Sequence, residues 1–190
     1  MSANHAAFNL IFRFVENYVS PIAGRISSQR HVMAIRDGFI SAMPFMIVGS
    51  FLLVFAYPPF SPDTTWGFAR AWLDMAKQFE GQILTPFDMT MGIMSIYICA
   101  AIAYNLGKHY VKSHQLDPFM CAMLSLMAFL LVAAPKTKGT LPVDSLGGTG
   151  IFTAILVAIY CVEMMRFLKA HNIGIRLPDQ VPPMIKNSFD

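Results

Sequence analysis

Charged residues are scarce in this chain of 190 residues. Asp, Glu, Lys and Arg make up 13% of it and hydrophobic residues 55%, whereas soluble domains usually carry about 25% charged residues. The net charge of +3 is too small to indicate binding to nucleic acid. This balance argues against an ordinary soluble domain and predicts an integral membrane protein.

Residues that commonly hold metals or haem are few and poorly spaced. The cysteines lack C-x-x-C spacing and fall within apolar runs, so we expect them to be small buried hydrophobic residues. The histidines lie outside the apolar runs, which excludes a haem held by histidines in mid-membrane. We therefore expect no metal, no cofactor and no redox reaction. The residues concerned are Cys99, Cys121, Cys161, His5, His31, His109, His114 and His171.

Four apolar stretches come close to the length of a transmembrane helix, which needs roughly 20 mainly apolar residues. The first is the clearest, and its Pro44 is tolerable within a membrane helix. Four such runs in one small chain would leave too little polar surface to cover them in water. We predict an all-α integral membrane protein with about four spans, at residues 38–57, 89–106, 118–134 and 146–162.

Two other stretches have one apolar and one polar face. Residues 8–19 predict a helix that ends at Pro21, and it would either lie in the membrane interface or pack against the protein's own spans. In residues 66–83, apolar side chains recur at spacings of three or four and charged residues face away. We expect this second amphipathic helix to lie along the opposite interface.

Lysine and arginine are unevenly shared between the two sides that four spans would create. Ten fall on one side and four on the other, so the positive-inside rule places both termini in the cytoplasm. The larger set is Arg13, Arg25, Arg30, Arg36, Lys108, Lys112, Arg166, Lys169, Arg176 and Lys186, and the smaller set is Arg70, Lys77, Lys136 and Lys138.

The polar residues near the spans indicate little chemistry. Glu163 lies at a predicted helix end, three residues before Arg166, where we expect an ion pair at the membrane rim rather than a coupling-ion site. His109 and His114 flank Lys112 in a predicted cytoplasmic turn and are expected to be solvated rather than to form a proton relay or metal pair. No catalytic, cofactor-binding, metal-binding or substrate-binding residue is predicted.

Small residues predict close helix packing in two places. Every fourth residue of the second span is small, which lets another helix approach, either within the protomer or across a dimer; internal packing is the commoner case. A glycine cluster opens the fourth span without the lysine of a phosphate loop, so we expect a close-packed or broken start to that helix. The residues are Ser95, Cys99, Ala103 and Gly107 in the stripe, and Gly147, Gly148 and Gly150 in the cluster.

Three segments of the chain carry distinctive sequences. They are residues 31–40 with Met43-Pro44 and Gly49-Ser50, residues 146–152, and residues 176–183 with Ser188-Phe189. In this order they resemble enzyme IIC of the lactose/cellobiose/diacetylchitobiose family of the phosphoenolpyruvate-dependent sugar phosphotransferase system. The segment 90–94 is similar to the family's second-span region, and the resemblance covers nearly the whole chain from Phe14 onward.

The resemblance implies a permease of the bacterial cytoplasmic (inner) membrane that binds a β-linked disaccharide, such as cellobiose, diacetylchitobiose or lactose, and releases it as its phosphate. In the family the phosphate comes from a phosphocysteine on enzyme IIB, which is charged through enzyme IIA. The resemblance covers the family's N-terminal scaffold and dimerisation half, so a homodimer is expected. The family's sugar site, with its histidine and glutamate, lies beyond residue 190.

Two functions therefore stay open for a chain that resembles half a permease. It could support disaccharide uptake and coupled phosphorylation once a complementary half is supplied. Alternatively, it could be a membrane interaction and dimerisation remnant without a sugar site. A membrane-bound redox enzyme is disfavoured because the ligand spacings of haem and iron–sulfur proteins are absent.

Overall fold

The computed structural model describes residues 13, 15–133, 143–171 and 173, and within them every regular element is a helix. The prediction of an all-α chain is confirmed for this part. The elements are a π-helical turn η1 (Val15–Val19), α2 (Ser20–Ser27), α3 (Arg30–Ala56), α4 (Gly67–Asp88), α5 (Met94–His114), α6 (Pro118–Ala133), two 3₁₀ segments η2 (Val143–Ser145) and η3 (Gly148–Gly150), and α7 (Ile151–Ala170).

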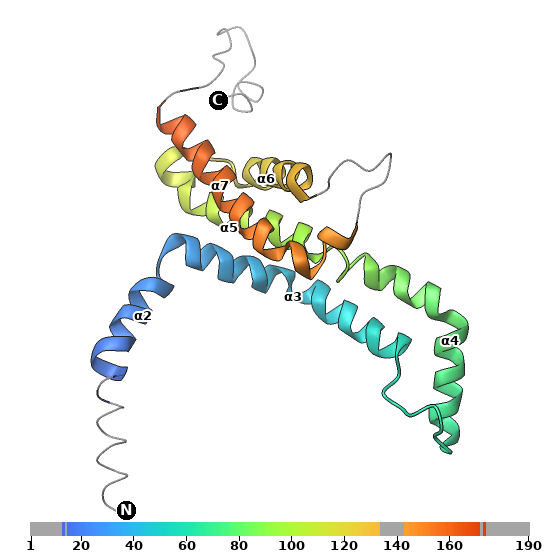
Figure 1. Ribbon diagram of the computed structural model, residues 1–190. Coiled ribbons are helices and arrows are strands. Elements are labelled where there is room, and N and C mark those ends of the chain that lie inside the picture. The colour runs from blue at the N-terminus through green and yellow to red at the C-terminus, as the bar shows by residue number, and fades with distance from the viewer. Residues whose placement is uncertain (1–12, 14, 134–142, 172, 174–190) are drawn as a thin grey trace, which may run out of the picture.

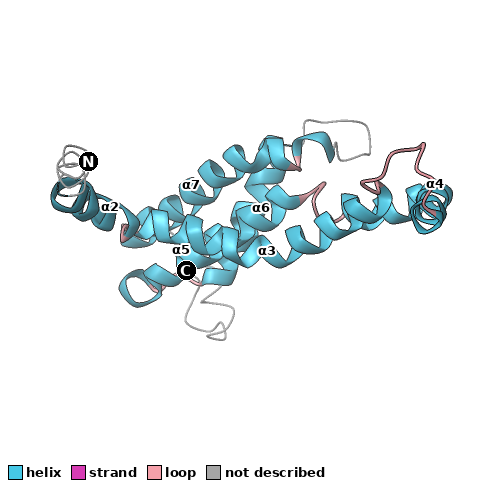
Figure 2. Ribbon diagram, turned by 90° about the horizontal axis from the view of Figure 1, so that it is seen from below, coloured by secondary structure: helices cyan, strands magenta, loops and turns pink. Residues whose placement is uncertain are grey.

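Helix α5 is the centre of the packing, because it contacts α3, α6 and α7 (Figure 1). Its buried face carries Ile98, Ile102, Leu106 and Tyr110, which recur every four residues and so lie on one side of the helix. The first part of α3 runs antiparallel to α5, and α4 packs against α3 in turn. Helices α2 and α4 lie at opposite ends of an elongated molecule (Figure 2).

The predicted small-residue stripe of α5 is a packing face inside the protomer. A Cβ added at Gly107 would lie only 3.0 Å from Cα of Pro118, the first residue of α6. The backbone N–H of Ser95 donates a hydrogen bond of 3.0 Å to the carbonyl oxygen of Leu146. All four members of the stripe, Ser95, Cys99, Ala103 and Gly107, are buried. Internal packing, the commoner of the two predicted cases, is therefore what the structure has.

The glycine cluster forms the broken helix start that the sequence predicts. Gly148–Gly150 is a 3₁₀ segment that leads directly into α7. A Cβ at Gly150 would collide with the carbonyl oxygen of Ser145 and lie 2.8 Å from Oγ of Ser95. Glycine is needed here because the backbone before α7 presses against both the preceding turn and α5.

Both amphipathic helices differ from their predicted limits. Half of the predicted helix 8–19, residues 8–12 and 14, lies outside the described part of the chain, and Val15–Val19 of the other half forms the π-helical turn η1. The prediction that Pro21 ends this helix is wrong, because Pro21 occupies the first turn of α2. Backbone N–H groups in the first turn of a helix have no acceptor within that helix, so proline, which lacks the N–H, is tolerated there. The second amphipathic helix, predicted at 66–83, continues through Pro86 to Asp88 as α4.

Helices α5 and α7 extend beyond their apolar stretches into polar sequence. Helix α5 reaches His114 and ends at Gln115, whose left-handed φ of 52° stops further helical bonding. His109 and His114 are thus in a helix, and their predicted turn is wrong. Likewise, α7 runs on to Ala170, so Glu163 is inside the helix rather than at its end. Hydropathy marks the apolar length, whereas backbone hydrogen bonds continue until a residue breaks them.

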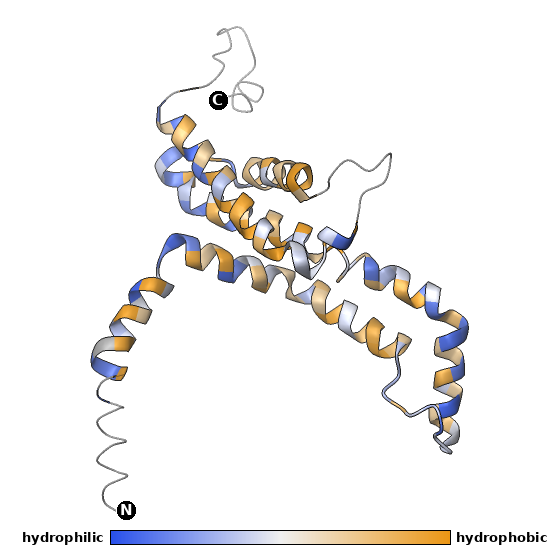
Figure 3. Ribbon diagram, in the orientation of Figure 1, coloured by the Kyte–Doolittle hydropathy of each residue, from blue (hydrophilic) through white to orange (hydrophobic). Residues whose placement is uncertain are grey.

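Two helices of the described residues are long and apolar enough to cross a membrane: α3, and α7 with its preceding 3₁₀ segment. Only 17% and 22% of their most apolar windows are buried, unlike the core helices of a soluble protein. Each of the helices α2 to α7 exposes large apolar side chains, among them Phe51, Leu131 and Phe152, which are 63%, 75% and 71% exposed. Apolar residues cover much of the bundle, and hydrophilic ones gather at its ends (Figure 3). Such a surface fits a bilayer.

Candidate functional site

A polar cluster lies at the end of the bundle where α3 begins and where α5 and α7 end. His31 is in the first turn of α3, and Tyr110 is in the last two turns of α5. Glu163 and Arg166 are three residues apart on α7, so they share one face of that helix. Tyr110 continues the buried row of α5, which turns its ring toward the other two helices.

Glu163 is at the centre of this cluster. Its Oε1 atom lies 2.9 Å from Nε2 of His31 and accepts a hydrogen bond of 2.6 Å from the hydroxyl of Tyr110. Its Oε2 atom lies 2.9 Å from Nε of Arg166, which confirms the predicted ion pair. The side chain is 25% exposed, so the pair is partly shielded from water. One carboxylate thus joins α3, α5 and α7.

The pKa values of two acidic groups of the cluster, the Tyr110 phenol and the Glu163 carboxyl, shift in opposite directions. Both residues lie outside the predicted spans 89–106 and 146–162. Burial, reinforced by the hydrogen bond to Glu163, raises the pKa of the Tyr110 phenol, so the phenol stays protonated and donates at neutral pH. Burial alone would raise the pKa of Glu163. The hydrogen bonds from Tyr110 and His31 and the charge of Arg166 outweigh it, so the pKa of this carboxyl is lowered.

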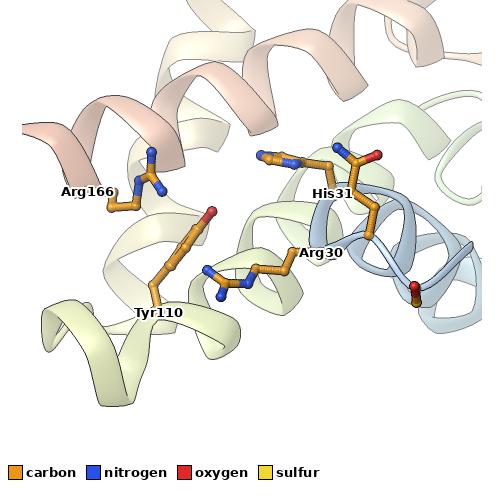
Figure 4. A pocket seen from close by; sticks show the side chains of 6 residues that line it. Arg30, His31, Tyr110 and Arg166 are labelled. Carbon is orange, nitrogen blue, oxygen red and sulfur yellow. The ribbon is translucent and has the colours of Figure 1, made fainter. Parts of the chain in front are cut away.

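Two guanidinium groups lie against the Tyr110 ring. The central carbon of Arg166 is 5.1 Å from the ring centroid, and that of Arg30 is 5.6 Å from it. Both distances are within the range of cation–π attraction. The same side chains border a pocket of about 380 Å³, toward which Figure 4 shows them converging. The pocket is lined by Ser28, Gln29, Arg30, His31, Tyr110 and Arg166.

The remaining singled-out residues lie away from this cluster. Cys99, Cys121 and Cys161 are free thiols and buried, as their apolar surroundings predict. Among the described residues, no group of three or more His, Cys, Asp or Glu side chains is arranged to hold a metal ion. The cluster therefore offers hydrogen bonds and positive charge, while its carboxylate is engaged in binding the helices together.

Sequence reasoning identified only the local pair Glu163–Arg166 and missed the rest of the cluster. His31 is 132 residues and Tyr110 53 residues away from Glu163 along the chain, so no helical spacing connects them. The signals present were weak: Tyr110 follows the stripe residue Gly107 by three positions, and His31 opens a segment that resembles the family.

Replacing Tyr110 by phenylalanine should lower the free energy of unfolding by about 1–2 kcal/mol, because a hydrogen bond to a charged group is lost from a half-buried site while the ring stays in place. Thermal unfolding of the detergent-solubilised chain measures this. The matched control is Tyr104→Phe, since Tyr104 is exposed on the same helix. Equal midpoints for the two variants would contradict a stabilising Tyr110–Glu163 bond.

Comparison with known proteins relates residues 36–190 to the family described as "Phosphotransferase system, EIIC". The chain is 35% identical over 193 aligned positions to the "PTS system cellobiose-specific EIIC component" of Geobacillus stearothermophilus, covering 93% of this chain and 40% of the relative. It is 34% identical to the "Lichenan permease IIC component" of Bacillus subtilis, covering 95% of this chain and 41% of that relative. The chain thus spans about two fifths of the length of these relatives.

A solved structure has the same arrangement of helices. It is the crystal structure of the transporter ChbC, the IIC component from the N,N'-diacetylchitobiose-specific phosphotransferase system. The two chains superpose with a TM-score of 0.74 at 34% sequence identity, over 93% of this chain and 42% of ChbC. Some other relatives are described as EIICB components, such as the lactose-specific protein of Streptococcus mutans, which is 34% identical.

Proposed function

Because this chain belongs to the EIIC family of the phosphotransferase system, we propose that it forms the N-terminal scaffold of a sugar permease in the bacterial cytoplasmic membrane. The observation that carries the proposal is the match along residues 36–190 together with a shared fold over 93% of the chain. The exposed apolar surfaces of α3 and α7 support insertion into the bilayer.

We also propose that the chain crosses the membrane about four times, at 38–57, 89–106, 118–134 and 146–162, with both termini in the cytoplasm. The packing supports this orientation, because the start of α3 and the ends of α5 and α7 meet at one end of the bundle. Six basic residues predicted to share the cytoplasmic side lie on these segments, namely Arg30, Arg36, Lys108, Lys112, Arg166 and Lys169. The positive-inside rule assigns that end to the cytoplasm.

The proposed substrate is a β-linked disaccharide of the cellobiose or diacetylchitobiose type, taken up with coupled phosphorylation. Relatives named for cellobiose and for N,N'-diacetylchitobiose support this class. The proposed partners are enzymes IIB and IIA and a second copy of the chain. The described residues provide the scaffold, and the sugar site is proposed to lie in the part of the family that this chain does not match.

Transport is tested by supplying the unmatched part of the permease in trans. A bacterial strain that lacks its own β-disaccharide permease but contains enzymes IIA and IIB would express this chain with the unmatched part of the Geobacillus stearothermophilus cellobiose component. We expect uptake of radiolabelled cellobiose above that of either part alone. If both parts insert, as judged by immunoblots of membranes, and uptake stays at background, the chain is instead a membrane interaction remnant.

A further inference from the structure

The pocket beside Tyr110 carries positive charge that the cluster does not neutralise. We propose that this pocket binds a phosphate group through Arg30 and Arg166. The group would come from the headgroup of an anionic phospholipid or from phosphate free in solution, and the experiment below distinguishes the two. This inference does not depend on the sugar that the family transports.

The charges in and beside the pocket do not balance. The Glu163 carboxylate accepts contacts from His31, Tyr110 and Arg166, and its negative charge offsets that of Arg166. Among the described residues, Arg30 forms no ion pair with a carboxylate, although Arg30 lies beside the same tyrosine ring. Within the described part of the chain, one positive charge of the pocket is therefore left without a carboxylate counter-ion, and the residues that line the pocket include no acid.

The side-chain donors of the pocket are suited to phosphate. A guanidinium group offers a planar fork of N–H donors that matches phosphate oxygens, and Arg30 and Arg166 line the same pocket. The Tyr110 ring lies 5.6 Å from Arg30 and 5.1 Å from Arg166, which limits the freedom of both side chains before a ligand arrives. Ser28 and Gln29 add neutral polar groups to the lining of the pocket.

The pocket lies between helix ends and is open to the surface. Its volume of about 380 Å³ leaves room for a phosphate group beside Arg30 and Arg166. In the proposed orientation, the end of the bundle where α3 begins and where α5 and α7 end faces the cytoplasmic leaflet, which would present anionic headgroups. Basic pockets between membrane helices on this side commonly hold such headgroups.

The test compares two variants that each remove one positive charge from the same end of the bundle. Arg30→Gln removes the uncompensated charge from the pocket. Lys108→Gln removes a charge from α5 that lies over Tyr104 instead, outside the pocket. The purified chain in neutral detergent would be titrated with phosphatidylglycerol and with cardiolipin, and bound lipid counted by native mass spectrometry.

We expect Arg30→Gln to weaken binding of the anionic lipid about tenfold, as loss of a charge-assisted contact predicts, and Lys108→Gln to weaken it less than about twofold. Arg30→Lys should retain part of the affinity, because the charge stays but the fork is lost. Circular dichroism and size-exclusion profiles would verify that each variant is folded. Equal losses in the two Gln variants would overturn the proposal, and no lipid bound by the wild-type chain would overturn the headgroup as the source of the phosphate.

A second arm identifies the source of the phosphate. Potassium phosphate would be added at constant ionic strength to the lipid-bound chain and to its Arg30→Gln variant. Displacement of lipid from the wild-type chain alone would show that the site accepts free phosphate as well. Retention of lipid at high phosphate concentration would assign the site to a membrane headgroup. Displacement to the same extent from both proteins would overturn the role of Arg30.

Discussion

Replacing Gly38 by leucine will separate α3 from α5 and strongly destabilise the chain. A Cβ at position 38 would clash with the Ile102 side chain and lie 3.0 Å from its backbone nitrogen and 3.1 Å from its Cα. The backbone of α5 cannot yield as a flexible side chain can, so α3 must shift. We expect the free energy of unfolding to fall by about 3 kcal/mol, and the unfolding midpoint in detergent to fall by roughly 10 °C.

The matched control for this experiment is Gly81→Leu. Gly81 lies inside α4, and a Cβ there would meet no atom within 4 Å. Leucine favours a helix over glycine by about 0.8 kcal/mol, so this variant should be unchanged or slightly more stable. If Gly38→Leu unfolds at the same temperature as Gly81→Leu, then close approach at Gly38 does not hold α3 against α5.

The core of this fold was predictable because it depends on local patterns. Spacing by four on one apolar helix marked the buried side of α5, and Gly107 of that stripe does lie against the first residues of α6. Gly38 and Gly49 of α3 were only noted as part of a resemblance, although both press against residues near or within α5. Their partners are more than forty positions away, so no spacing within α3 could reveal them.

The limits of the helices were less predictable than their existence. Apolar composition identifies the length that a bilayer would cover, but α5 continues past it to His114 because nothing before Gln115 breaks the hydrogen-bond ladder. Pro21 was wrongly expected to end a helix, and Pro86 lies within α4 without ending it. Proline is a weak guide to the end of a helix when it falls in a first turn or close to the last one, as it does in α2 and α4.

The polar cluster was the least predictable feature, since it exists only after three helices pack together. Sequence spacing supplied the pair Glu163–Arg166 and indicated a simple ion pair at the rim. The same carboxylate in fact contacts a histidine from α3 and a tyrosine from α5. The environment of Glu163 is set by helix ends that meet only in the folded chain. The pKa of its carboxyl therefore could not be predicted from the residues next to it in the sequence.

Glu163 should therefore contribute more to stability than any exposed acid of the chain. Glu163→Gln keeps the shape of the side chain but removes the charge that Arg166 and Tyr110 contact. We expect a loss of about 2 kcal/mol, below the usual cost of breaking a fully buried pair because this site is partly exposed. The matched control is Glu80→Gln, which removes an exposed acid bonded to Tyr57 and should cost less than about 0.5 kcal/mol.

The pH dependence of stability separates the contribution of the Glu163 charge from that of the shape of its side chain. Because the folded pKa of Glu163 lies below the ordinary value of 4.5, its contribution is fully present above that value and disappears as the pH falls through the folded pKa. Unfolding midpoints measured from pH 7 downward should thus fall more steeply for the wild-type chain than for Glu163→Gln, and the two curves should converge below pH 4.5. Parallel curves across this window would show that the carboxylate charge does not hold α3, α5 and α7 together.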